Sequence, residues 1–264
     1  MLARLDINPS YRRWNDRWGA PSGFSRWTNR LPREYWTRPI AASLVGCFAF
    51  QENNCTRSFE YPWAFEALKI FPGARVLEIG GGLSGLQFVL DRHGCEVINV
   101  DPGVAARGVG WPVDQDSIGT LNRRFGTRVH LKNCFIETAG LEDAFFDRAV
   151  SVSAIEHIPE DDILTILSHI RRVLKPGGLL VLTVDLFLDL QPFTCVEENR
   201  FGQNVSIRWL VENSGLEMIA GCPEELYGFE AFDATRTLKR LPEFLIGAKW
   251  PALVQTLVLR KAEG

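Results

Sequence analysis

Residues 76–85 read Val-Leu-Glu-Ile-Gly-Gly-Gly-Leu-Ser-Gly, and the expected architecture follows from this stretch. The apolar start is typical of a buried strand, and Gly80, Gly82 and Gly85 have the G-x-G-x-x-G spacing. Glycines let a backbone turn sharply and approach a ligand closely, and the following helix start offers free N–H groups. The spacing alone is a weak signal, because NAD, FAD and S-adenosylmethionine sites all show it.

Two acidic residues beside this glycine loop distinguish between these cofactors. Asp101 ends the next apolar run, where a carboxylate suits the two hydroxyls of a ribose. Glu78 lies two residues before the first glycine, where it would repel a diphosphate but suit the ammonium of an aminoacyl tail. The pair favours S-adenosylmethionine over a dinucleotide. The alternative for Glu78 is a polar strand end without a ligand.

Short apolar segments alternate with amphipathic ones from residue 61 onward. We expect strands at 75–79, 96–100, 128–132, 148–152, 179–184, 216–220 and 253–259, and helices at 61–71, 84–92, 116–125, 159–174 and 205–213. This alternation is typical of an α/β, doubly wound, mostly parallel sheet with helices on both faces. The sequence therefore predicts seven strands, the last of them antiparallel to its neighbours.

Four segments of the chain resemble the class I S-adenosylmethionine-dependent methyltransferases. They are VLEIGGGLSG (76–85), VINVDP (97–102), FDRAVSVSAIEHI (146–158) and VLKPGGLLVLTV (173–184), and the resemblance covers about residues 60–220. It implies a Rossmann-like methyltransferase fold, S-adenosylmethionine as the cofactor, and methyl transfer as the reaction.

The resemblance also implies the cofactor site. In that family the glycine loop holds the methionine tail, the acid after the second strand binds the ribose, and the loop after the third strand flanks the adenine. The corresponding residues here are Glu78, Gly80, Gly81, Gly82, Asp101, Pro102, Asn133, Cys134, Phe135 and Ser153. Asn133 stands where many relatives have an acid, but its carbonyl oxygen can still accept from an adenine amino group.

The acceptor is expected at the carboxyl end of the fourth strand, where the chain reads Ser153-Ala-Ile-Glu-His157. This segment lacks the Asn/Asp-Pro-Pro-Tyr/Phe tetrad of the family's amino-nitrogen enzymes and the Pro-Cys nucleophile of its cytosine-carbon enzymes. A small-molecule or saccharide (glycosidic) acceptor methylated at oxygen is therefore preferred. The catalytic candidates are His157, whose imidazole titrates near neutrality, and Glu156. The alternative is that both residues only shape the pocket.

Two other functions remain open at this point. An NAD(P)-dependent oxidoreductase would use the same glycine loop, but Glu78 and the absence of a Tyr-x-x-x-Lys pair count against it. A catalytically silent module would bind S-adenosylmethionine without transferring its methyl group.

Residues 1–60 differ in composition from the rest, with nine Arg against five acidic residues and four of the eight Trp. We expect an Arg/Trp-rich helical extension at 1–60 and a methyltransferase domain at 61–264. The clusters Arg12, Arg13, Trp14, Arg17, Trp18 and Arg26, Trp27, Arg30, Arg33 either form a lid over the acceptor or fix the extension to the core. The 222–250 insertion between the last two strands either walls the acceptor pocket or forms a homo-oligomer contact.

Composition limits the partners. The chain has 264 residues, a formal charge of −3 and a pI near 5.9, which disfavours nucleic-acid binding. The longest apolar run, residues 39–50, is too short to span a bilayer, and no signal-peptide pattern is present at the start. Single, scattered cysteines and four histidines predict no metal site and a reduced, cytoplasmic chain.

Overall fold

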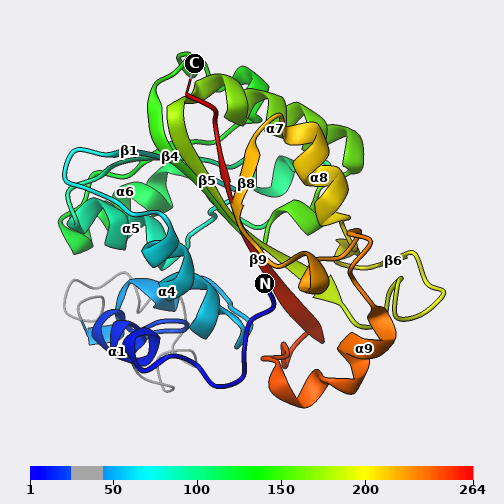
Figure 1. The fold of residues 1–264 in the computed structure, drawn as a ribbon. Helices are drawn as coiled ribbons and strands as arrows, with labels where there is room; N and C mark the ends of the chain where they lie inside the picture. Colours follow the sequence, from blue (N-terminus) through cyan, green and yellow to red (C-terminus); the bar gives the residue numbers. More distant parts are fainter. Residues whose placement is uncertain (25–43, 264) are drawn as a thin grey trace.

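The computed structural model describes residues 1–24 and 44–263. Its centre is a seven-stranded sheet of order β3-β2-β1-β4-β5-β9-β8 (Figure 1). The strands are β1 (Arg75–Ile79), β2 (Glu96–Val100), β3 (His130–Lys132), β4 (Phe146–Val152), β5 (Leu174–Phe187), β8 (Glu217–Ala220) and β9 (Ala252–Arg260). β9 is antiparallel to β5 and β8, and the other neighbouring pairs are parallel. The predicted doubly wound, mostly parallel fold is confirmed.

Helices cover both faces of this sheet (Figure 1). On one face, α4 (Arg57–Ala67), α5 (Gly85–Arg92) and α6 (Gln115–Phe125) bury their apolar sides in one core cluster. On the other face, α7 (Glu160–Val173) and α8 (Ile207–Ser214) do the same in a second cluster. A two-stranded ribbon, β6 (Glu198–Asn199) and β7 (Gly202–Gln203), follows β5. The sheet thus lies between two helical layers.

Local signals explain where several helices begin and end. Asp114 accepts the Ser117 N–H at 2.7 Å at the start of α6, and Gly126 ends that helix with a φ of +64°. Ser206 accepts the Trp209 N–H at 3.2 Å at the start of α8. Side-chain oxygens at this position satisfy one of the free N–H groups of a first helical turn.

The strand β5 is longer than predicted, because it begins at Leu174 and not at residue 179. The sequence predicts a helix to residue 174 and a strand from 179, on either side of the Pro-Gly-Gly sequence at 176–178. Instead Leu174 already pairs with Phe146 of β4, and the register shifts before Leu179 pairs with Arg148. The glycines therefore form an irregularity inside the strand, where flexible residues tolerate a bulge.

The helix α4 lies four residues earlier than predicted, at 57–67 in place of 61–71. Phe71 precedes a proline, which disfavours helical backbone, and Lys69 already has a φ of +45°. Phe71 is consequently exposed. The earlier start places Arg57 and Glu60 on the helix face that packs on the sheet.

The described part of the extension packs on the core. Residues 1–3 pair with β9 beyond the end of β8, through the Ala3 N–H to the Val254 oxygen at 2.9 Å and the Thr256 N–H to the Met1 oxygen at 2.8 Å. Helix α1 (Pro9–Trp18) lies on α4, and the Trp14 ring lies 5.7 Å from that of Phe48. Arg12, Arg13 and Arg17 of the first cluster are exposed. The second cluster, with Arg26, Trp27, Arg30 and Arg33, lies outside the described residues.

Candidate active site

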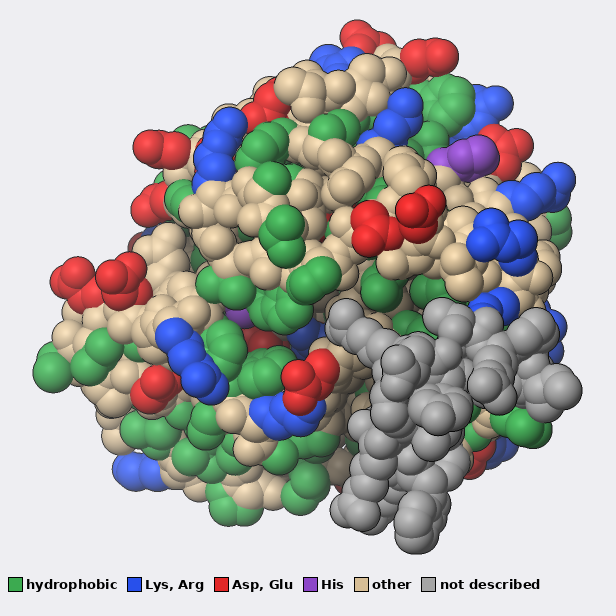
Figure 2. Space-filling model, turned by 180° about the vertical axis from the view of Figure 1, so that it is seen from behind, with side chains coloured by type: hydrophobic (Ala, Val, Ile, Leu, Met, Phe, Trp, Pro, Cys, Tyr) green, Lys and Arg blue, Asp and Glu red, His purple; other side chains and the backbone are tan. Residues whose placement is uncertain are grey.

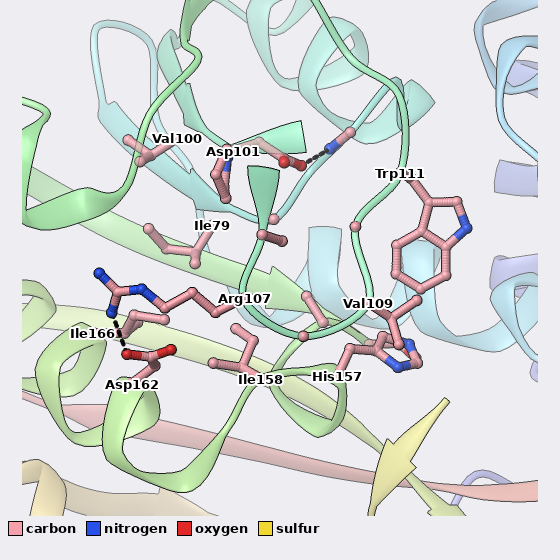
Figure 3. A pocket seen from close by; sticks show the side chains of 18 of the residues that line it. Ile79, Val100, Asp101, Arg107, Val109, Trp111, His157, Ile158, Asp162 and Ile166 are labelled. Carbon is pink, nitrogen blue, oxygen red and sulfur yellow. Dashed lines mark hydrogen bonds and ion pairs between the residues drawn. The ribbon is translucent and has the colours of Figure 1, made fainter. Parts of the chain in front are cut away.

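A cavity opens at the carboxyl ends of β1, β2 and β4. Its lining comes from the glycine loop and the end of the extension. The segment after β2, the turn after β4 and the start of α7 complete it (Figure 3). This is the edge at which ligands bind in open α/β sheets. The predicted site residues that line it are Gly80, Gly82, Asp101, Pro102, Phe135, Ser153 and His157.

The glycine loop leaves no room for side chains. Gly80 has a φ of +66°, and a Cβ there would lie 2.7 Å from the Ala154 Cβ. Gly82 has a φ of +53°, and its Cβ would lie 2.6 Å from Oε1 of Gln51. Gly85 has another role, since a Cβ there would lie 2.5 Å from the ring of Phe48. Gly80 and Gly82 also line the cavity, and we call this part of the loop the glycine cradle, whereas Gly85 only packs closely on Phe48.

Asp101 ties the glycine loop to the end of β2. Its Oδ2 accepts the Gly82 N–H and its Oδ1 accepts the Gly103 N–H, each at 2.7 Å. Burial raises the pKa of this carboxyl, while the two backbone N–H groups oppose that rise. The residue lines the cavity, and each of its oxygens retains a further lone pair. Its contact with a ribose stays a prediction.

Two buried amides that sequence reasoning missed support the same loop. Asn99 donates from Nδ2 to the Gly82 oxygen at 3.0 Å, and Gln87 donates from Nε2 to the Ser84 oxygen at 3.0 Å. The two amides also bond to each other at 3.1 Å. The available signal was Asn99 itself, a polar residue in the apolar run of β2.

Glu78 lies beneath the loop and does not line the cavity. Its side chain is almost fully buried under Gly81, its Oε1 accepts the Ser84 hydroxyl at 2.8 Å, and its Oε2 has no partner among the described residues. Burial raises the pKa of this carboxyl to about 7. Two roles are compatible with this carboxyl. Its free oxygen can bind a cationic tail held at the loop, or the carboxyl can act only as a structural hydrogen-bond acceptor for Ser84.

The loop after β3 contributes less than predicted to the cavity wall. Phe135 lines the cavity, whereas Asn133 and Cys134 do not. The Asn133 amide donates to the Asp101 backbone oxygen at 2.9 Å, and Cys134 packs against the core. An adenine role for these two residues stays a prediction.

On the acceptor side, His157 lines the cavity next to Trp111, with ring centroids 4.8 Å apart (Figure 3). Its Nδ1 lies within hydrogen-bonding distance of the Phe201 backbone oxygen, which can only accept. Nδ1 therefore carries a hydrogen, and Nε2 of the neutral ring is left as an acceptor. Burial lowers the pKa of His157, which favours that neutral form.

Glu156 is fully buried and lies behind the cavity wall. Its Oε1 accepts the hydroxyl of Ser153, a residue held at a φ of +46°. Arg57, also missed from the sequence, lines the cavity and donates to Glu60. The second guanidinium of the lining, Arg107, bonds to Asp162 (Figure 3) and also to Glu137.

A family model described as a methyltransferase domain matches residues 61–220. The chain belongs to this family, and the predicted resemblance to class I S-adenosylmethionine-dependent methyltransferases is confirmed, together with the cofactor class. The match disfavours the oxidoreductase alternative. The glycine cradle and the carboxylate of Asp101 in the cavity fit that cofactor.

One curated relative is a ubiquinone biosynthesis O-methyltransferase of Cereibacter sphaeroides, 32% identical over 112 residues. The aligned part covers 42% of this chain and 41% of the relative. Two solved structures share the fold, each with a TM-score of 0.53 and 77% of this chain covered. They are the [4+2]-cyclase SpnF, 17% identical over 81% of its chain, and the 1,6-didemethyltoxoflavin-N1-methyltransferase of Burkholderia thailandensis with bound S-adenosylhomocysteine, 18% identical over 78%.

No described helix is long and apolar enough to cross a membrane. Within residues 1–24 and 44–263, no group of three or more His, Cys, Asp or Glu side chains has a geometry suited to a metal ion.

Glu78→Gln tests the predicted contact with the cofactor's ammonium. Because the pKa of Glu78 is about 7, its carboxylate forms as pH rises from 6 to 8, and the affinity for S-adenosylhomocysteine should rise about tenfold over that range. The variant keeps an acceptor oxygen for Ser84 but should lose this rise. Calorimetric titrations at each pH measure it, and identical pH profiles for both proteins would leave Glu78 as a loop brace only.

Proposed function

We propose that this protein transfers the methyl group of S-adenosylmethionine to an oxygen of a small-molecule acceptor. The bound cofactor supplies a methyl group that is already activated by a sulfonium. The observation that carries the choice of oxygen is the neutral imidazole of His157 in the cavity lining, with Nδ1 bonded to Phe201. A hydroxyl must lose a proton when it is methylated, and a neutral Nε2 can take it. The O-methyltransferase name of the Cereibacter relative supports the same choice.

Charge and shape favour an uncharged ring as the acceptor. Both guanidiniums in the described lining, Arg57 and Arg107, are already paired with carboxylates, so neither is left to hold an anionic group. The aromatic rings of Trp111 and Trp250 offer flat apolar faces. Figure 2 shows acidic and basic side chains interspersed on the visible face, which gives no support to a nucleic acid. A hydroxylated aromatic or saccharide ring fits these observations best.

The catalytically silent module is the second candidate, and one comparison favours keeping it. SpnF shares this fold and is described as a cyclase, so the fold by itself does not carry methyl transfer. Residues on the acceptor side of the site must therefore distinguish a methyltransferase from a silent module.

We further propose that residues 61–264 form the methyltransferase domain and that residues 1–60 cover part of its site. Gln51 and Asn53, at the end of the extension, line the cavity, and Gln51 accepts the Leu83 N–H at 2.8 Å. Trp250, at the end of the 222–250 insertion, lines it too, which supports a walling role for that segment over self-association. All six cysteines are free thiols, which supports a cytoplasmic location.

A label-transfer assay tests the proposal. The full chain is incubated with methyl-labelled S-adenosylmethionine and panels of uncharged phenols, glycosides, amines and carboxylates, and mass spectrometry locates the label. We expect label on the oxygen of an uncharged hydroxylated ring. Label on nitrogen would refute the choice of oxygen. Binding of S-adenosylhomocysteine without transfer to any panel would favour the silent module, and binding of NAD instead would refute the whole proposal.

A further inference from the structure

A cluster of buried carboxyls lies behind the acceptor side of the cavity. Glu60 on α4, Glu156 in the turn after β4 and Asp185 near the end of β5 are each fully buried. Glu60 is satisfied, because Arg57 donates to one of its oxygens and the Thr183 hydroxyl donates to the other at 2.7 Å. The only guanidinium in this part of the described chain, Arg57, is thus committed to Glu60.

The other two carboxyls are not satisfied. Oε1 of Glu156 accepts the Ser153 hydroxyl and the Asp185 N–H at 3.2 Å, but its Oε2 has no partner among the described residues. Neither oxygen of Asp185 has a partner there. Two neighbouring carboxylates cannot both stay charged so deep in a protein, because desolvation and mutual repulsion favour protonation of one. Burial and this repulsion raise the pKa of Asp185, and burial raises that of Glu156.

We infer that Glu156 and Asp185 share one proton behind His157, and that the negative charge they retain makes Asp185 a positioning residue for the base. The inference rests on the proposed function. When the acceptor hydroxyl is methylated, its proton passes to Nε2 of His157 and leaves an imidazolium. The shared proton stays on the carboxyl pair throughout, and the negative charge on Asp185 offsets the new positive charge.

Several charged groups face these residues from different elements. Burial lowers the pKa of His157, the Phe201 oxygen and the Asp185 carboxylate raise it, and Arg57 on α4 lowers it. Asp185 in turn faces Glu156, Glu60 and Arg57. Substitutions of Glu156 and Asp185 should therefore shift the pKa of His157 in opposite directions: loss of the Glu156 carboxyl leaves Asp185 ionised, whereas loss of the Asp185 carboxyl removes its charge.

Asp185→Asn removes the carboxylate that favours the imidazolium. The pKa of His157 should fall by about 0.5–1 unit, so the ring becomes a weaker base and kcat should fall about two- to tenfold. The rising limb of kcat/KM against pH should move to lower pH, because His157 loses its proton earlier.

Glu156→Gln keeps an oxygen for the Ser153 hydroxyl and the Asp185 N–H but removes the carboxyl that shares the proton. Asp185 should then be fully ionised, and both the pKa of His157 and the rising limb should move to higher pH by about 0.5 unit. A role in folding alone would lower activity or stability without opposite shifts.

Proton NMR titration of the His157 ring, assigned by comparison with His157→Gln, is the decisive readout. It works without turnover, so a failure of the proposed function is distinguished from a failure of this inference. Asp147→Asn, at the other end of β4 and paired with Lys175, is the matched control and should leave the His157 titration unchanged. Shifts of one sign in both variants, or no shift in either, would overturn the inference. If one variant does not fold, the sign of the shift in the other decides.

Discussion

Gly80→Ala is expected to lower the affinity for S-adenosylhomocysteine by about 30- to 1000-fold. A non-glycine residue at a φ of +66° costs about 1–2 kcal/mol, and a Cβ at 2.7 Å from that of Ala154 adds about 1–2 kcal/mol of crowding. The loop can relieve the backbone strain and the crowding only by changing the conformation that forms the cradle. At about 1.4 kcal/mol for each tenfold in affinity, the sum corresponds to the stated loss. Calorimetric titration measures it.

Gly73→Ala is the matched control for this prediction. Gly73 also has a positive φ, +82°, but a Cβ there would have no atom within 4 Å. This variant should lose about 1 kcal/mol of unfolding free energy and keep full affinity. Adding Ala154→Gly to Gly80→Ala removes the crowding and should restore part of the binding. A single Gly80→Ala variant that binds as tightly as the parent would contradict the cradle.

His157→Gln is expected to lower kcat by about 10²- to 10⁴-fold, the usual contribution of a general base, while the affinity for S-adenosylhomocysteine stays within about twofold. The imidazole lies on the acceptor side, so its loss removes the group that takes the proton and leaves the glycine loop intact. The measurement is single-turnover methyl transfer together with calorimetric binding. His130→Gln, on the exposed surface of β3, should change neither quantity. Full turnover with intact binding would remove His157 as the base.

The fold could be predicted from the sequence because its signals are local. The apolar run into the glycine loop, the helix end at Gly126 and the amphipathic face of α7 each lie within about a dozen residues. The predicted start of β5 was wrong because a neighbouring strand decides it: Leu174 joins β5 by pairing with Phe146. The periodicity of a sequence predicts local structure and cannot predict which strands pair.

The site could be predicted only in outline. Motifs locate loops, but they do not say which way a side chain points, so Phe135 lines the cavity whereas the adjacent Cys134 packs inward. Arg57 was missed because no local signal shows that α4 turns this side chain toward the cavity, where it pairs with Glu60 on the same helix. Asp185 lies one residue beyond the predicted strand, and nothing near it in the sequence signals that it lies beside Glu156.

The contact of Phe48 with Gly85 couples two positions that lie 37 apart in the chain. Any residue with a Cβ at 85 would need a smaller one at 48, and the packing of the short helix η2 (Cys47–Phe50) against α5 would loosen with it. Evolutionary drift at these two positions should therefore be correlated. Relatives that keep an aromatic residue at position 48 should also keep glycine at position 85, even where this glycine contacts no ligand.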